Sequence, residues 1–136
     1  MGEVGKKKVL IVDEDPDVRA FVQAALEDEG YEFVIATDGN VAIAKATSEK
    51  PDVVIMDVQM PNRDGLSALY HLRQEPETKS IPVILLTGVA ETTGVRFTAE
   101  SVEEFMGERP DVFIDKPAEP EELRNAVRDL LARGES

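Results

Sequence analysis

The chain has 136 residues, no cysteine and a formal net charge of −13. This length fits one domain with its own hydrophobic core, and the lack of cysteine excludes disulfides and thiolate metal sites. The acidic balance argues against nucleic acid as the main partner, because binding phosphates requires Lys and Arg. No apolar run approaches the roughly 20 residues that span a bilayer, and the start is unlike a signal peptide. We therefore expect a cytoplasmic protein that makes no membrane contact.

The first strand and the first helix are predicted near the N-terminus. Residues 1–7 lack a pattern and are expected to form a flexible tail. The apolar run 9–12 predicts a strand. Asp15 and Pro16 suit the start of a helix, and Gly30 suits its end. Helical spacing predicts one buried face, made of Val18, Phe21, Val22, Ala25 and Leu26.

Two more strand–helix units follow. Residues 33–36 predict the second strand, and a helix over about 40–48 would pack through Ala42, Ile43 and Ala46. Four apolar residues then run straight into Asp57, which indicates a third strand buried on both faces. The next helix, about 66–74, is expected to turn Leu66, Leu69 and Tyr70 inward.

The last third of the chain predicts two further strands. Residues 83–86 form the fourth and 112–114 the fifth. Between them, the polar stretch 89–100 has weak periodicity, and a short helix is expected near 101–107. The final helix, about 120–132, places on one face Leu123, Ala126, Val127, Leu130 and Leu131.

The alternation of strand and helix, five times over, predicts an α/β fold. Apolar strands joined by helical crossovers imply a parallel sheet covered on both faces, and right-handed crossovers leave few topologies. We expect a flavodoxin-like, doubly wound sheet of five strands in the order 2-1-3-4-5, with five helices in a three-layer αβα sandwich. Residues 8–133 would make up this domain.

Acidic residues follow two strands that are neighbours in this order. Asp13 and Glu14 follow the first strand and Asp57 ends the third, so all three should meet in the crevice where the strand order reverses. A like-charged pair at 4 Å costs about 4 kcal/mol at an effective dielectric constant of 20. Protonation, a basic partner or a metal ion could relieve this repulsion. Among metals, Mg²⁺ suits such oxygen ligands.

The fourth and fifth strands deliver two further polar groups to the same edge, Thr87 and Lys116. A carboxylate, metal-binding acids, an ammonium and a hydroxyl together suit phosphoryl transfer, and a carboxylate can accept the phosphoryl group covalently. Each residue alone has a structural explanation: a helix start for the acids, a strand end for Thr87, a loop for Lys116 and core packing for Phe113. Their convergence on one edge favours the functional interpretation.

Four motifs stand in order along the chain: Val9-Leu10-Ile11-Val12-Asp13-Glu14-Asp15-Pro16, Met56-Asp57-Val58-Gln59-Met60-Pro61 with Asp64-Gly65, Leu85-Leu86-Thr87-Gly88, and Asp115-Lys116-Pro117. Together they resemble bacterial response-regulator receiver domains of two-component systems, over roughly residues 8–132.

The resemblance implies a role for each residue of the site. Asp57 would accept a phosphoryl group from a histidine kinase or a histidine phosphotransfer protein. Asp13, Glu14, Asp57 and the backbone carbonyl of Gln59 would hold Mg²⁺ or Mn²⁺. Thr87 and Lys116 would bind the phosphoryl oxygens, Phe113 would be the switch aromatic, and the bond before Pro117 would be cis. Phosphotransfer and autodephosphorylation would be self-catalysed, without a conventional enzyme activity.

Three features depart from the family's common pattern. Glu14 stands where Asp is common, Phe113 lacks the hydroxyl of the frequent Tyr, and the segment 88–110 is longer than usual. We expect a long loop there in place of the usual fourth helix. No output domain would follow the last helix, which predicts a stand-alone regulator that is monomeric or dimerises on phosphorylation and acts through an unknown protein target.

Alternative functions are a receiver-like adaptor that works without phosphorylation and an intermediate phosphate carrier in a relay. A phosphatase of the haloacid-dehalogenase type would need a second Asp where Gln59 stands. A nucleotide or flavin module would need a Gly-rich or Ser/Thr-rich loop after the first strand, where this chain has three acids.

Overall fold

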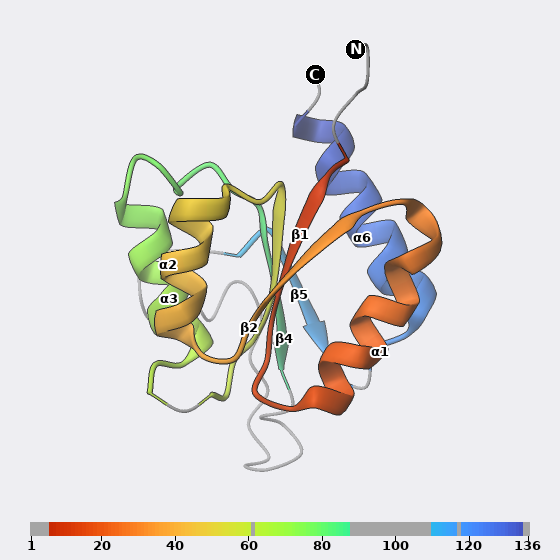
Figure 1. Cartoon of the computed structure of the whole chain (residues 1–136), viewed down its shortest axis with the longest axis horizontal. Coiled ribbons are helices and arrows are strands. Elements are labelled where there is room, and N and C mark those ends of the chain that lie inside the picture. Colours follow the sequence, from red (N-terminus) through yellow and green to blue (C-terminus); the bar gives the residue numbers. More distant parts are fainter. Residues whose placement is uncertain (1–5, 61, 88–109, 117, 135–136) are drawn as a thin grey trace.

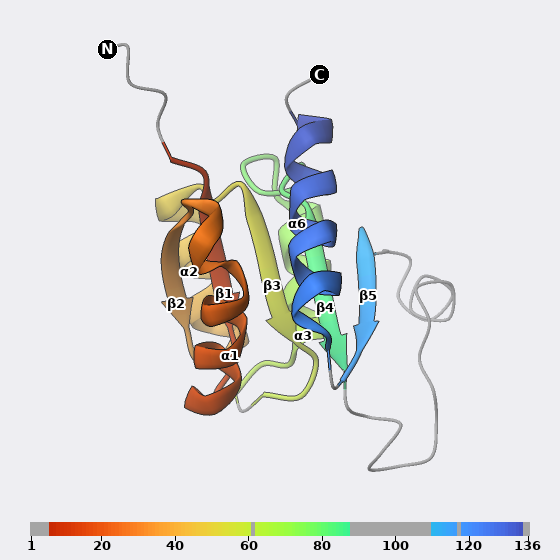
Figure 2. The ribbon, with the colours of Figure 1, turned by 90° about the vertical axis from the view of Figure 1, so that its right-hand side faces the viewer.

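The computed structural model describes residues 6–60, 62–87, 110–116 and 118–134. Its centre is a five-stranded parallel sheet with the strand order β2-β1-β3-β4-β5 (Figure 2). This confirms the predicted order 2-1-3-4-5. The strands are β1 (Lys8–Val12), β2 (Glu32–Ala36), β3 (Val53–Asp57), β4 (Val83–Thr87) and β5 (Val112–Asp115).

Helices cover both faces of the sheet, so that the fold has three layers. In Figure 1, α1 and α6 lie on one side of the strands, and α2 and α3 lie on the other. The described residues contain four α-helices and a 3₁₀-helix: α1 (Pro16–Leu26), η1 (Glu27–Glu29), α2 (Gly39–Glu49), α3 (Gly65–Gln74) and α6 (Pro120–Gly134). The helix predicted near 101–107 lies outside the described residues.

Two apolar clusters, one on each face, hold the layers together. Alternate residues of a strand point to opposite faces, and β1 divides accordingly. Val9 and Ile11 join the first cluster with Leu26 and Leu123 from the helices α1 and α6. Their neighbours in β1, Leu10 and Val12, join the second cluster with residues of α2 and α3: Ala42, Ala46, Ala68, Leu69 and Leu72.

Aspartates begin three of the helices. The side chains of Asp15, Asp38 and Asp64 accept backbone hydrogen bonds near the starts of α1, α2 and α3. These bonds satisfy N–H groups that have no partner within the helix. At the other end of the first helical segment, Gly30 adopts φ = 81°, as expected for a glycine that ends a helix.

Two aromatic residues predicted to face inward are exposed instead. Tyr70 is 47% exposed and Phe21 is 42% exposed, so the prediction was wrong for both side chains. The buried face of α3 has the spacing i, i+3, i+4 and i+7, and consists of Gly65, Ala68, Leu69 and Leu72. Glycine and alanine at the first two positions bring α3 close to the sheet, and this leaves Tyr70 on the outer side of the helix.

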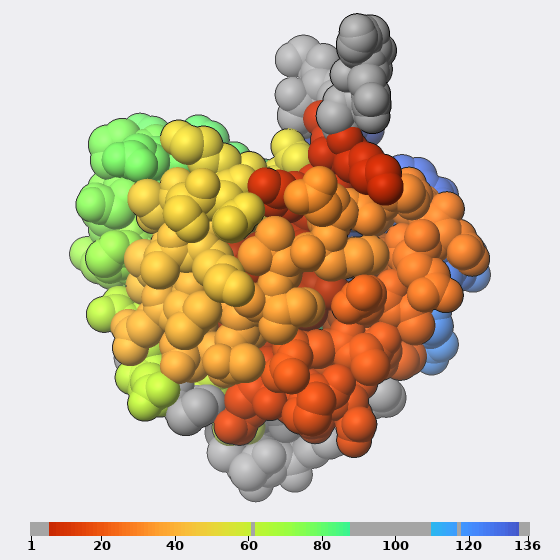
Figure 3. All heavy atoms as spheres, viewed as in Figure 1, coloured from red at the N-terminus to blue at the C-terminus, as the bar shows by residue number. Residues whose placement is uncertain are grey.

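The edge of the sheet at β2 lies between helices of the two outer layers. In the space-filling view of Figure 3, atoms of β2 are flanked by those of α1 and α2. Lys45 of α2 donates to the carbonyl of Ile35 on this strand at 2.8 Å. None of the helices within the described residues is long and apolar enough to cross a membrane.

At the end of the sheet where β4 begins, Asp111 joins several segments. Its carboxylate accepts hydrogen bonds from the backbone N–H of Val83 and from Arg73 of α3, each at 2.8 Å. Its other oxygen lies 3.3 Å from Arg133 near the end of α6. Asp111 therefore ties β4, α3 and α6 together.

Replacing this carboxylate should destabilise the fold. Asp111→Ala removes the acceptor of the Val83 N–H and of Arg73, so we expect a loss of about 2 kcal/mol in the free energy of unfolding, measured by urea denaturation. The control is Arg128→Ala, which breaks an ion pair between Arg128 and Glu29. Because the Arg128 side chain is 58% exposed, this variant should lose less than about 1 kcal/mol in the free energy of unfolding. Equal losses in the two variants would contradict the role given to Asp111.

Candidate functional site

The register of the sheet brings the predicted site residues to one edge. Asp57 is the last residue of β3, Thr87 is the last residue of β4, and Lys116 follows β5 directly. Val12, the last residue of β1, pairs with Met56, so Asp13 emerges beside Asp57. Because all strands run in the same direction, their carboxyl ends form a single edge.

Lys116 joins the two acids. Its ammonium lies 2.9 Å from Asp57 Oδ1 and 3.5 Å from Asp13 Oδ2. Both aspartates are buried, at 3% exposure for Asp13 and 5% for Asp57. The backbone N–H of Lys116 donates to the carbonyl of Thr87 at 2.7 Å, which fixes the start of the lysine side chain relative to β4. Lys116 thus contacts Asp13 and Asp57, two of the three acids that were expected to meet at this edge.

The second oxygen of Asp13 has a separate partner. Asp13 Oδ1 accepts a hydrogen bond from the backbone N–H of Asp15 at 2.9 Å, and Arg19 of α1 donates to the backbone carbonyls of Asp13 and Glu14 at 2.9 and 3.1 Å. The turn between β1 and α1 is thus held from both sides. This arrangement directs Asp13 Oδ2 towards Lys116.

Burial and charge oppose each other at this site. Burial raises the pKa of Asp57, the hydrogen bond from Lys116 works against that increase, and the charge of Asp13 adds to it, so that the net direction is upward. Burial alone would lower the pKa of Lys116, but its contacts with Asp57 and Asp13 outweigh burial and raise it. Lys116 therefore stays protonated, whereas ionised Asp57 carries a desolvation cost.

The other predicted residues lie at different positions around this group. Thr87 is buried, at 3% exposure, and Phe113 packs partly buried against the second apolar cluster. Glu14 and Gln59 are exposed. Within the ranges that the structure describes, no three His, Cys, Asp or Glu side chains are grouped closely enough to hold a metal ion. The structure thus brings Asp13, Asp57 and Lys116 together, and the metal-binding roles of Asp13, Glu14, Asp57 and Gln59 stay predictions. The predicted cis bond before Pro117 lies outside the described residues.

The remaining charge fits a hard cation. The two carboxylates of Asp13 and Asp57 face a single ammonium, which leaves one negative charge uncompensated among these three groups. Carboxylate oxygens with positions open to water are the ligands that Mg²⁺ prefers. The donor set is therefore suited to a divalent ion such as Mg²⁺.

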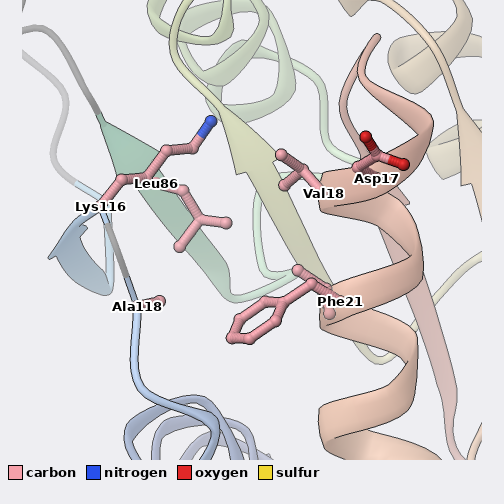
Figure 4. A pocket seen from close by; sticks show the side chains of 7 residues that line it. Asp17, Val18, Phe21, Leu86, Lys116 and Ala118 are labelled. Atoms are coloured by element: carbon pink, nitrogen blue, oxygen red, sulfur yellow. The ribbon is translucent and has the colours of Figure 1, made fainter.

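An apolar pocket of about 410 Å³ opens beside the site. In Figure 4, Val18 and Phe21 of α1 face Leu86 of β4 and Lys116, while Ala118 lines the end nearest α6. The exposure of Phe21, which contradicted the sequence prediction, reflects its place on the wall of this pocket. The site is therefore bordered by a largely apolar recess on its α1 side.

Sequence reasoning missed the close packing around the loop after Asp57. A Cβ atom added to Gly65 would collide with the backbone of Asp57, and one added to Gly39 would lie 2.5 Å from the carbonyl oxygen of Arg63. The sequence signal for both positions was available as Asp-Gly pairs at 38–39 and 64–65. Each pair supplies a capping carboxylate followed by a residue that permits close backbone approach.

Comparisons with known proteins agree with this geometry. The family model described as the response regulator receiver domain matches residues 9–128. The response regulator Rre1 of Synechocystis is 37% identical over 92% of this chain and 52% of its own length. The chain spans about half the length of the curated relatives it matches.

Solved structures show the same fold. A putative response regulator from Chloroflexus aurantiacus has a TM-score of 0.81 and 32% identity, over 95% of this chain and all of that one. The receiver domain of the sensor histidine kinase PA1611 from Pseudomonas aeruginosa, solved with a magnesium ion in its active site cleft, has a TM-score of 0.78 over 94% of this chain and 99% of that one. At 22% identity the latter similarity shows the fold alone.

The raised pKa of Asp57 leads to a stability prediction. A carboxyl whose pKa is higher in the folded state binds its proton more tightly there, so stability falls as pH rises from the ordinary carboxyl value through the raised one. Asp57→Asn removes this titration and should raise the free energy of unfolding at pH 7. The gain should shrink as pH falls below the pKa of Asp57, as measured by urea denaturation at several pH values. If Asp57→Asn is less stable than the wild type at pH 7, the raised pKa given to Asp57 is contradicted.

Proposed function

The chain belongs to the response regulator receiver domain family, and we propose that it accepts a phosphoryl group on Asp57 and thereby changes its binding to a protein partner. The observation that carries this proposal is the contact of Asp57 with Lys116, together with the burial of both aspartates at the sheet edge. Asp57 has a basic neighbour, Lys116, that stabilises its negative charge and an acidic neighbour, Asp13, that repels it.

In the proposed reaction an oxygen of Asp57 forms a bond to phosphorus. The bond between the same phosphorus atom and the donor's histidine nitrogen breaks, and its electron pair stays with that nitrogen. Lys116 lies 2.9 Å from Asp57 Oδ1, close enough to neutralise charge that develops on the phosphoryl oxygens. Thr87, the last residue of β4, would donate its hydroxyl to one of them. Autodephosphorylation would return the phosphoryl group to water.

Asp13, Glu14, Asp57 and the Gln59 carbonyl would hold Mg²⁺ or Mn²⁺. When bound, the ion supplies positive charge to the phosphoryl oxygens. The charge left over between Asp13, Asp57 and Lys116 supports its binding.

The switch would connect Thr87 to Phe113. These residues lie on neighbouring strands: Thr87 pairs with Asp115 across β4 and β5, and Phe113 is two residues earlier on β5. A phosphoryl group that draws Thr87 towards Asp57 favours the packing in which the Phe113 ring is more deeply buried. This is a shift between two populations, because the phosphoryl group binds one of them better.

The partners follow from the same proposal. The donor would be a histidine kinase or a histidine phosphotransfer protein, and the output would be a contact with another protein in the cytoplasm, by a monomer or a phosphorylation-linked dimer. The net charge of −13 disfavours direct binding of nucleic acid by this chain. That the regulator acts as a stand-alone domain stays a prediction, and so does its assignment to residues 8–133.

A mass measurement tests the proposed acceptor. Acetyl phosphate with Mg²⁺ should add the mass of one phosphoryl group to the intact chain, and a chelator should abolish the gain. Asp57→Asn should gain nothing, whereas the control Asp64→Asn, which keeps a capping side chain on the exposed start of α3, should still be modified. A folded wild-type chain that gains no mass would favour the adaptor that works without phosphorylation.

A second measurement tests the switch. In the phosphorylated wild type, the NMR signals of the Phe113 ring should move away from their positions in the unmodified protein. Thr87→Ala should still accept the phosphoryl group but should lose most of this shift, because the group that the phosphate attracts is gone. The control Thr37→Ala replaces an exposed threonine beyond β2 and should respond as the wild type does. A full shift in Thr87→Ala would show that Phe113 does not depend on Thr87.

A further inference from the structure

The loop that follows Asp57 is fastened to the start of α2 by side chains that no part of the proposed reaction uses. Asn62 Nδ2 donates to Asp38 Oδ2 at 2.7 Å, and the backbone N–H of Gly39 donates to the carbonyl of Arg63 at 3.0 Å. Asp38 is buried, at 9% exposure. Two successive residues of the loop are thus held against two successive residues at the start of α2.

Asn62 is suited to this contact by its backbone as well as its side chain. Its φ of 66° lies in the left-handed region, which asparagine tolerates better than most residues. Asp38 serves two partners, because its Oδ1 accepts the Val41 N–H at 2.9 Å while its Oδ2 accepts from Asn62. These bonds lower the pKa of Asp38, with the Val41 bond as the larger cause and the Asn62 bond as the second, so the carboxylate stays ionised at neutral pH.

The near end of the same loop is also fixed. The N–H of Val58 donates to Leu86 at 3.0 Å, and its carbonyl accepts from Gly65 at 2.8 Å. Only three residues, 59–61, lie between this anchor and Asn62, so the four steps from Val58 to Asn62 span at most about 14 Å. With both ends fixed, the path of the backbone at Gln59 depends on where Asn62 is held.

We propose that Asp38 and Asn62 are positioning residues, and that their hydrogen bond, which we call the α2 latch, sets the backbone at Gln59 for binding Mg²⁺ beside Asp57. The inference rests on the proposed function, in which the backbone carbonyl of Gln59 is a ligand of Mg²⁺. Neither Asp38 nor Asn62 needs to touch the ion or the phosphoryl group. Mutation of a residue that orients a metal ligand without touching the metal typically weakens metal binding by about 10- to 100-fold.

The two side chains allow a test by exchange of donor and acceptor. Asn62→Asp places a second carboxylate against Asp38 and removes the donor, so the latch is lost and the two charges repel. Adding Asp38→Asn restores a donor and an acceptor across the same gap with the net charge of the wild type. Asn62→Gly tolerates the positive φ and removes the side chain without adding charge. Asn40→Ala is the control, because it breaks only the exposed bond from Arg63 Nε to Asn40 Oδ1.

The readouts are the dissociation constant for Mg²⁺, measured by isothermal titration calorimetry, and the rate of mass gain with acetyl phosphate as a function of Mg²⁺ concentration. Asn62→Asp and Asn62→Gly should weaken Mg²⁺ binding about 10-fold and need correspondingly more Mg²⁺ for half-maximal phosphorylation. The double variant should return to near the wild-type values, and Asn40→Ala should not differ from them. Circular dichroism would establish that each variant is folded.

Different results would overturn the two proposals. If the wild type binds Mg²⁺ and gains mass while both Asn62 variants match Asn40→Ala, the α2 latch is not a positioning device and the proposed function stands. A double variant as weak as Asn62→Asp would also refute the latch. If the folded wild type neither binds Mg²⁺ nor gains mass, the proposed function fails, and the role given to the latch fails with it.

Discussion

The contact of one ammonium with two buried carboxylates is the constraint on which the site depends. Lys116 reaches Asp57 at 2.9 Å and Asp13 at 3.5 Å, and these residues lie at the ends of three different strands. A carboxylate removed from water without a basic partner carries a cost of several kcal/mol. The carboxyl ends of β1, β3 and β5 must therefore lie level with one another at one edge of the sheet, and the parallel register places them there.

The lysine offsets only part of this cost. Two negative charges face one positive charge, and burial raises the pKa of Asp57 in spite of Lys116. The two apolar clusters must offset the unfavourable contribution of the site to folding, since burial of apolar surface is the main favourable contribution. A fully neutralised site would be more stable, but it would have less attraction for a divalent ion. The charge imbalance is thus a compromise between stability and binding.

Most of the fold could be predicted from local pattern. Apolar runs that end in polar residues located all five strands, and the expected order, confirmed by the structure, was chosen among the few topologies that right-handed crossovers allow. Asp13, Asp57, Thr87 and Lys116 were found because each directly follows or ends a strand. The inward faces of the helices were predicted less well: large residues such as Tyr70 were chosen over small ones such as Ala68, although small residues allow the closest approach to the sheet.

The loop contacts could not be predicted because they join segments by single hydrogen bonds without any periodic signal. Asp38 and Asn62 are 24 positions apart, and each has an ordinary local explanation as a cap or a turn residue. Yet Met60 in this loop and Phe113 on β5 both pack against the second cluster, beneath α2 and α3. A phosphoryl group on Asp57 would thus act on one apolar layer from two sides, through the loop and through β5. In the proposed switch, the α2 latch would hold the loop in place, and the change in packing would fall on Phe113.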